Sequence, residues 1–230
     1  MLIVKKAKMK NNRVKISVII NVLVTVLVLL ACIIMFTGFK FMTDIGPKLE
    51  TTGLGMLRFF TIDSNIFVGI ISILFAIEEI KFLKGKIKDV SPLMYKLKFM
   101  ATTSVTLTFF VVFAYLGPIS KGGVKTLLVN SNLFLHLIIP VLSIITFTIF
   151  DKEEEFKFKN TFFSIIPTLV YGVFYLINVI VHMEGGKVSP IYDWYYFVYY
   201  GVWTAIIVIP LMLIITYVLG LILWHLNKRL

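Results

Sequence analysis

The stretch ISVIINVLVTVLVLLACIIMFT, residues 16–37, is an apolar run of 22 residues with no charged side chain. A helix rises about 1.5 Å per residue, so about 20 residues cross the roughly 30 Å of hydrocarbon in a bilayer. The whole chain has the same character, because 59% of its 230 residues are hydrophobic and only 15% are charged. Since soluble domains rarely have this composition, we expect an integral membrane protein.

Six apolar runs of this kind divide the chain, and the gaps between them are too short for a second folded domain. The predicted fold is all-α, a polytopic bundle of six transmembrane helices over residues 16–225. A basic tail precedes it at residues 1–15, and a short basic tail follows at residues 226–230. The runs cover residues 16–37, 57–77, 95–117, 129–149, 161–181 and 197–224.

The formal net charge of +11 is unevenly divided between the two sides of this topology. With the N-terminus inside, 17 of the 23 Lys and Arg residues lie on the cytoplasmic side and 6 on the other. The positive-inside rule therefore puts both termini in the cytoplasm. We expect the basic surplus to face anionic lipid headgroups, not nucleic acid. The heavy use of Lys, Ile, Phe and Asn is typical of an AT-rich genome, so a bacterial plasma membrane is the expected location.

Metal, disulfide and lipid-anchor sites find little support in the sequence. The single cysteine, Cys32, excludes an internal disulfide. The sequence LLAC that it ends is similar to a lipoprotein signal, but IIMF continues the apolar run, which favours a plain membrane-spanning cysteine. The three histidines, His136, His182 and His225, have no pair at the helical spacing of metal ligands. We therefore expect no metal and no cofactor.

Polar side chains recur at helical spacing on three of the predicted spans, and each set forms a stripe on one helix face. Polar groups are costly in lipid, so such stripes usually face the interior of a bundle. We expect them to enclose one polar chamber that opens toward the outer leaflet, with Tyr192 and Asp193 near its mouth. The stripes are Arg58, Thr61, Asn65 and Ser72; Asn132, His136, Pro140 and Ser143; and Ser164, Thr168, Tyr171, Tyr175, Asn178 and His182.

Structural roles compete with functional ones at several of these positions. Thr61 can cap the second span, and Asp63 suits the positive end of a helix dipole. His136 can be a core histidine that holds a kink at Pro140. The run YDWYYFVYYGVW, residues 192–203, is typical of an interfacial aromatic belt, with a lipid tunnel as the alternative. We expect the mixed-charge loop DKEEEFKFKN, residues 151–160, to be solvated surface.

Three motifs occur in order on alternating sides of the predicted spans: RFFTIDSN (58–65), NLFLHLIIPVL (132–142) and VHMEGGKVSPIYDW (181–194). In these the chain resembles the androgen-induced-gene / FAR-17a family of membrane hydrolases and its bacterial six-helix relatives. The resemblance implies that Thr61 is a nucleophile and that His136, shortly before a proline, is its partner. It also implies a substrate of the fatty-acid ester or hydroxy-fatty-acid ester type, cleaved within the membrane.

This chemistry is coherent with the residues themselves. A threonine hydroxyl needs a base to remove its proton, and histidine suits that task. Attack on an ester builds an oxyanion that needs hydrogen-bond donors, for which Arg58, Asn65 and Asn132 are candidates. Asp193 is a candidate for orienting the imidazole. We also expect Asn178 and His182 at the outer side, as contacts for a substrate headgroup or as packing residues.

Three functions remain open at this point. The first is an intramembrane lipid-ester hydrolase or a related acyltransferase, with membrane lipids and a lipid-like ester as its partners. The second is a six-helix binding or transport subunit for a small molecule, with a polar pocket but no catalysis. The third is a structural membrane protein in which the polar stripes only join helices. A reactive threonine would favour the first, and a co-purifying ligand would favour the second.

Overall fold

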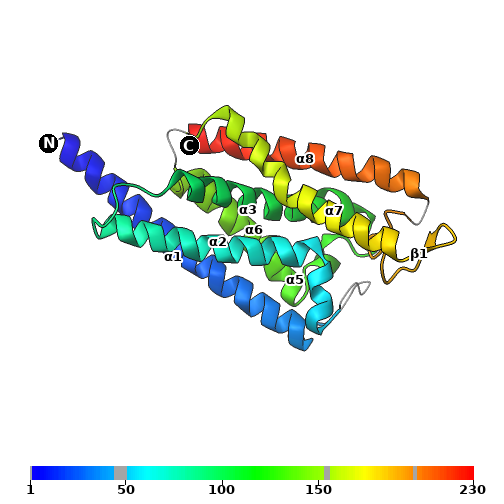
Figure 1. Cartoon of the computed structure of the whole chain (residues 1–230). Helices are drawn as coiled ribbons and strands as arrows, with labels where there is room; N and C mark the ends of the chain where they lie inside the picture. The colour runs from blue at the N-terminus through cyan, green and yellow to red at the C-terminus, as the bar shows by residue number, and fades with distance from the viewer. Residues whose placement is uncertain (1, 44–50, 153–155, 199–200) are drawn as a thin grey trace.

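The structure, a computed structural model, describes residues 2–43, 51–152, 156–198 and 201–230 and is almost entirely helical (Figure 1). Short π-helical and 3-10 segments continue or join the α-helices. In chain order the elements are α1 (Leu2–Thr37), η1 (Gly53–Arg58), α2 (Phe60–Leu83), α3 (Pro92–Phe110), η2 (Val111–Leu116), α4 (Gly117–Ile119), η3 (Val124–Leu127), α5 (Ser131–Leu133), η4 (Phe134–Ile138), α6 (Ile139–Ile145), η5 (Thr146–Phe150), η6 (Phe158–Ile165), α7 (Ile166–Val181), β1 (Met183–Glu184), β2 (Lys187–Val188) and α8 (Val202–Arg229).

Within the described residues, five helical segments are long and apolar enough to cross a membrane, which supports a membrane-embedded helical protein. They match five of the six predicted runs to within a few residues. The remaining run corresponds to α2, a helix of 24 residues that carries Asp63 near its start and Glu78, Glu79 and Lys81 near its end. The N-terminal tail is not a separate segment, because α1 begins at Leu2 and continues without a break through the first run. The five segments are Asn11–Thr37, Pro92–Ile119, Ser131–Phe150, Phe158–Val181 and Trp203–Arg229.

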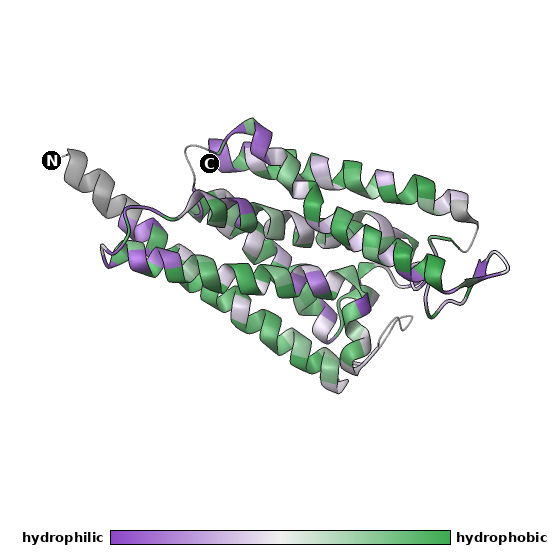
Figure 2. Ribbon diagram, viewed as in Figure 1, coloured by the Kyte–Doolittle hydropathy of each residue, from purple (hydrophilic) through white to green (hydrophobic). Residues whose placement is uncertain are grey.

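The helices lie roughly along one direction, and both termini are at the same end of the molecule (Figure 1). Hydrophilic residues gather at the two ends, whereas the long sides of the helices are mostly hydrophobic (Figure 2). Large apolar side chains point outward along these sides, including Ile33, Ile180 and Ile207, which are 60%, 65% and 67% exposed. Such exposure is unfavourable in water but favourable in hydrocarbon, as expected of a bundle surrounded by lipid.

The first two helices approach each other closely at Gly69 of α2. A Cβ atom on Gly69 would lie 3.0 Å from Cγ1 of Val28 on α1, so only a residue without a side chain fits there easily. Thr25 on α1 donates a hydrogen bond to the backbone oxygen of Gly69 at 3.0 Å. Small residues allow this kind of backbone contact between membrane helices, where packing takes over the role that the hydrophobic effect has in water.

Charged and polar side chains are buried between α1, α2, α3 and the end of η5. Ser17 donates to Asp151 at 2.5 Å, and Lys98 donates to Ser72 at 2.8 Å and also to Asn21. The Lys98 ammonium lies 3.8 Å from the Asp151 carboxylate, and both side chains are fully buried. Burial raises the pKa of Asp151 above its ordinary value, and the charge of Lys98 opposes that rise. This buried ion pair holds four helical segments together.

The expectation of a solvated loop at residues 151–160 is therefore wrong for its first residue. Asp151 is only 1% exposed, because the chain turns inward after η5 and places the carboxylate against Lys98. Phe156 is 4% exposed and packs its ring 5.1 Å from that of Phe99. Residues 153–155 lie outside the described residues.

Candidate functional site

The polar residues at the start of α2 divide between two faces of the helix. Phe59 has an extended backbone (φ −93°, ψ 129°), and α2 begins at the next residue. Each residue then turns the helix by about 100°. Thr61 and Asp63 consequently lie on nearly opposite faces, and Asn65 shares the face of Thr61 while Phe60 and Phe67 share that of Asp63; Ser64 lies between the two faces.

The face of α2 that carries Thr61 and Asn65 is hydrogen-bonded to the segment that carries His136. Asn65 is fully buried, and its Nδ2 donates to the backbone oxygen of Thr61 at 2.7 Å and to that of Leu135 at 3.2 Å. Both amide hydrogens of Asn65 are thereby used, so this residue positions the chain and is not free to donate to an oxyanion. The structure thus brings the turn of Thr61 against the residue that precedes His136.

His136 lies in η4, a π-helical segment directly before the proline of α6. Pro140 has no N–H to donate to the carbonyl of His136, and the π-helical pattern is an alternative for such a freed carbonyl. The Nδ1 atom of His136 is 3.0 Å from the backbone oxygen of Leu127. A carbonyl oxygen only accepts, so Nδ1 carries the proton and the Nε2 lone pair of the neutral ring is left available. Within the described residues, no hydrogen bond joins Thr61 to His136.

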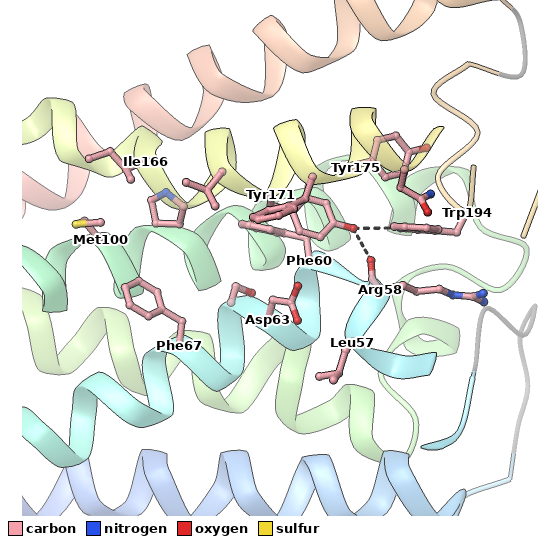
Figure 3. A pocket seen from close by; sticks show the side chains of 15 residues that line it. Leu57, Arg58, Phe60, Asp63, Phe67, Met100, Ile166, Tyr171, Tyr175 and Trp194 are labelled. Atoms are coloured by element: carbon pink, nitrogen blue, oxygen red, sulfur yellow. Dashed lines mark hydrogen bonds between the residues drawn. The ribbon is translucent and has the colours of Figure 1, made fainter. Parts of the chain in front are cut away.

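The face of α2 that carries Asp63, here called the second face, lines a cavity of about 620 Å³ between α2 and α7 (Figure 3). Its lining is mostly apolar, and the exposed side chains of Leu57, Val170 and Phe174 lie at its rim. The Asp63 carboxylate points into the cavity, whereas the guanidinium of Arg58 points away from Asp63 (Figure 3). The full lining is Leu57, Arg58, Phe60, Asp63, Ser64, Phe67, Met100, Ile166, Pro167, Val170, Tyr171, Phe174, Tyr175, Asn178 and Trp194.

The aromatic run after β2 closes one end of this cavity, the end at which Trp194 lies. Trp194 donates from Nε1 to the hydroxyl of Tyr171 at 3.1 Å, and Tyr171 donates to the backbone oxygen of Arg58 at 2.5 Å. The hydroxyl of Tyr195 accepts from the backbone N–H of Phe60 at 3.0 Å. Burial raises the pKa of Tyr195 to about 12. One residue of this run lines the cavity, so it is more than a belt at the membrane surface; residues 199–200 lie outside the described residues.

Asp193 holds this aromatic run in place from inside. It is 2% exposed and accepts hydrogen bonds from the hydroxyl of Tyr175 and from the backbone N–H groups of Phe197 (2.9 Å) and Val198 (3.1 Å). The proposed role of orienting His136 falls instead to the Leu127 carbonyl, because Asp193 is committed to these three donors. Asp193 therefore shapes the cavity wall.

Asn178 and His182 fasten the end of α7 to the same run. Asn178 donates to the backbone oxygen of Tyr192 at 2.8 Å. The ring of His182 stacks on that of Tyr192 with centroids 3.7 Å apart, and His182 is exposed. Beyond it the sequence GG turns β1 back onto β2, and Gly185 and Gly186 both have positive φ (55° and 76°), as this tight turn requires. This small hairpin was not predicted from the sequence.

The expectation of one polar chamber is thus only partly met. Of the predicted site residues, Arg58 and Asn178 line the cavity between α2 and α7, whereas Thr61, Asn65 and His136 are not part of its lining. Asn132 is half-buried on α5, one turn before His136. The cavity also contains Asp63, Ser64 and Trp194, which sequence reasoning did not assign to a site. The spacing of Asp63 from Phe60 and Phe67 would have revealed the second face of α2, whereas Trp194 comes from a distant part of the chain.

Within the part of the chain that the structure describes, no group of three or more His, Cys, Asp or Glu residues could hold a metal ion. Comparison with protein-family models, with curated proteins and with solved structures finds no match.

Proposed function

We propose that the chain crosses a bacterial plasma membrane six times, with α2 as the additional span and both termini in the cytoplasm. At about 1.5 Å per residue, the 24 residues of α2 reach about 36 Å, enough to cross the hydrocarbon. An odd number of spans would put the termini on opposite sides, whereas they lie at the same end of the molecule (Figure 1). The excess of Lys and Arg on that side supports a cytoplasmic location.

We further propose that this protein is an intramembrane hydrolase of lipid esters, of the fatty-acid ester or hydroxy-fatty-acid ester type, with Thr61 as nucleophile and His136 as base. The observation that carries the proposal is the position of His136. Its Nδ1–H is held by the Leu127 carbonyl, which leaves Nε2 able to accept a proton, and Asn65 fastens the turn of Thr61 to the neighbouring Leu135. Catalytic hydrogen bonds are often long before substrate binds, so the absence of a Thr61–His136 bond is compatible with this role.

The reaction then follows in two balanced halves. Nε2 of His136 takes the hydroxyl proton of Thr61 as Oγ1 attacks the ester carbonyl, and the negative charge moves to the carbonyl oxygen. Asn132 is the side chain best placed to donate to that oxyanion, because both hydrogens of Asn65 are used. Collapse releases the alcohol, which takes the proton from His136, and leaves an acyl-threonine. Water attacks this ester with His136 again as base, and Thr61 regains its proton.

Hydrolysis of a fluorogenic long-chain ester by the purified protein in detergent tests this proposal. We expect Thr61→Ala and His136→Gln each to abolish turnover, by at least about a hundredfold, while both variants remain folded. Ser64→Ala is the matched control, because Ser64 is a second hydroxyl on the same helix and lines the cavity. Full activity of Thr61→Ala together with loss in Ser64→Ala would overturn the role of Thr61. An inert wild type that forms no acyl-enzyme would overturn hydrolysis itself.

A binding or transport protein without catalysis is the second candidate, and one observation favours it. The cavity between α2 and α7 does not include Thr61 or His136 in its lining, so a molecule there would not touch the proposed pair. In that case ligand binding survives in Thr61→Ala and His136→Gln, and no ester is turned over. Mass spectrometry of the purified protein for a retained small molecule distinguishes this function from hydrolysis.

A further inference from the structure

Asp63 places a carboxylate in the cavity between α2 and α7 without any compensating group. Within the described residues, its side chain takes part in no ion pair and accepts no hydrogen bond. The nearest cationic side chain in the lining, Arg58, points away from Asp63 (Figure 3) and lies over the ring of Phe59 at 4.9 Å. A single negative charge in a mostly apolar cavity attracts a positively charged ligand.

Apart from the guanidinium of Arg58, whose Nε has no partner, each side chain of the lining that can donate already makes a hydrogen bond. Trp194 donates to Tyr171, Tyr171 to the Arg58 backbone oxygen, and Tyr175 to Asp193. Ser64 donates to the backbone oxygen of Thr61 at 3.1 Å. Asn178 likewise donates to a backbone oxygen, that of Tyr192. An anionic or strongly accepting headgroup placed beside Asp63 would meet few free donors, because the guanidinium of Arg58 points away from it (Figure 3).

Aromatic rings surround the same space. The rings of Phe60 and Tyr171 lie 5.2 Å apart, and those of Tyr175 and Trp194 lie 5.0 Å apart. Aromatic rings together with a carboxylate are the groups with which proteins bind alkylammonium ions. The deeper lining, which includes Phe67, Met100 and Ile166, is apolar and suits a hydrocarbon chain.

We propose that this cavity binds an amphipathic ammonium compound, whose cationic head contacts Asp63 and the surrounding rings and whose alkyl chain lies along Phe67, Met100 and Ile166. A membrane lipid with an amine or trimethylammonium head and a free long-chain amine share this chemistry. The inference does not depend on Thr61 or His136, which lie outside the cavity lining. An absence of ester hydrolysis would therefore not contradict the proposed binding of an ammonium compound.

A structural role for Asp63 predicts a different result. Asp63 is in the first turn of α2, where the helix dipole favours a carboxylate whether or not a ligand is present. On that account, replacing Asp63 weakens the fold slightly and has no effect on the choice of ligand. The two accounts are separated by measuring charge preference in addition to stability.

The experiment uses the full chain in a neutral maltoside detergent, with Trp203 and Trp224 replaced by Phe so that only Trp194 fluoresces. An alkyltrimethylammonium and an alkylsulfonate of equal chain length are titrated separately. We expect saturable binding of the ammonium compound at least about tenfold tighter than that of the sulfonate. Equal binding of the two by the wild-type cavity overturns the proposal without any variant of Asp63.

Two variants then test whether Asp63 causes the preference for the ammonium compound over the sulfonate. Asp63→Asn should reduce ammonium affinity by about tenfold or more, whereas Glu184→Gln, an exposed carboxylate on the hairpin, should leave it unchanged. An unaltered preference in Asp63→Asn overturns the assignment. Tetramethylammonium tests the hydrocarbon part of the proposal: much weaker binding of this small cation shows that the alkyl chain contributes, and equally tight binding overturns that part.

Discussion

Asn65 on α2 donates a hydrogen bond to the backbone oxygen of Leu135 at 3.2 Å, across 70 positions of the chain. The same Nδ2 atom donates to Thr61 one turn earlier, so one amide group connects the proposed nucleophile's turn to the segment of the proposed base. Asn65 is a positioning residue in this arrangement, because it need not touch the reacting atoms.

Asn65→Leu should therefore affect both stability and rate. Two backbone oxygens lose their donor, and we expect the free energy of unfolding to fall by about 1–3 kcal/mol. The kcat for ester hydrolysis should fall with little change in KM, because the alignment of Thr61 with His136 is lost whereas Asn65 itself need not contact the substrate. Asn132→Leu is the matched comparison on the facing segment: it should lower kcat without lowering stability. A loss of stability with unchanged kcat would assign Asn65 a purely structural role.

Lys98→Met should be among the most destabilising single changes. The substitution leaves the Asp151 carboxylate buried without its counter-charge, which typically costs about 3–5 kcal/mol. Adding Asp151→Asn should recover part of the loss, and this coupling is the diagnostic result. Lys96→Met should cost far less, because Lys96 lies on the opposite face of α3. It is half-buried, with its ammonium 5.3 Å from the centre of the Phe163 ring. Unfolding in mixed micelles with increasing dodecyl sulfate measures all three variants.

Gly69→Ala should destabilise the contact between α1 and α2 by about 1–3 kcal/mol, because its new methyl group would lie 3.0 Å from Val28. The double variant Gly69→Ala, Val28→Ala should recover stability by making room. Gly172→Ala is the control, since its Cβ would lie at an ordinary 3.6 Å from Ile209 and alanine favours a helix. Equal stabilities of the two single alanine variants would show that the close approach at Gly69 is not limiting.

The aromatic run predicts an alkaline transition. Burial raises the pKa of Tyr195 to about 12 from an ordinary value of 10.0, so the folded state holds the phenol proton more tightly than the unfolded state. The resulting stability is complete below pH 10 and is lost as the pH rises toward 12, by at most about 1.4 kcal/mol per pH unit. Thermal unfolding at several pH values should show this slope in wild type and in the exposed Tyr115→Phe. Tyr195→Phe should show a smaller slope, because one buried phenol is removed while those of Tyr171 and Tyr175 remain, and an unchanged slope there would assign the transition to another group.

The fold could largely be predicted from the sequence, because a bilayer imposes a length on every apolar helix. Residues 161–181 were predicted as one span, and the structure has Phe158–Val181. The sequence could not predict that Lys98 and Asp151 pair, since they are far apart in the chain and each alone is typical of a membrane surface. The inward turn after η5 that brings them together depends on the packing of Phe156 and Phe99.

The candidate site could be predicted less well. The stripe of Arg58, Thr61 and Asn65 identified a polar face of α2, but a 3.6-residue period also places Asp63 on a second face with Phe60 and Phe67. Which face meets a cavity depends on where α7 and the aromatic run lie, and no local pattern encodes that. The hydrogen bond from His136 to Leu127 likewise depends on the path of a loop.

The apolar rim of the cavity determines how a ligand reaches it. Leu57, Val170 and Phe174 are 43%, 48% and 68% exposed, and in a bilayer they face hydrocarbon, whereas Trp194 and Tyr171 close the outer end. Exchange of a ligand is therefore a sideways diffusion from the surrounding leaflet. Occupancy of the cavity then follows the mole fraction of the ligand within the membrane or micelle. Adding inert detergent while the total ligand concentration stays constant should therefore empty the cavity.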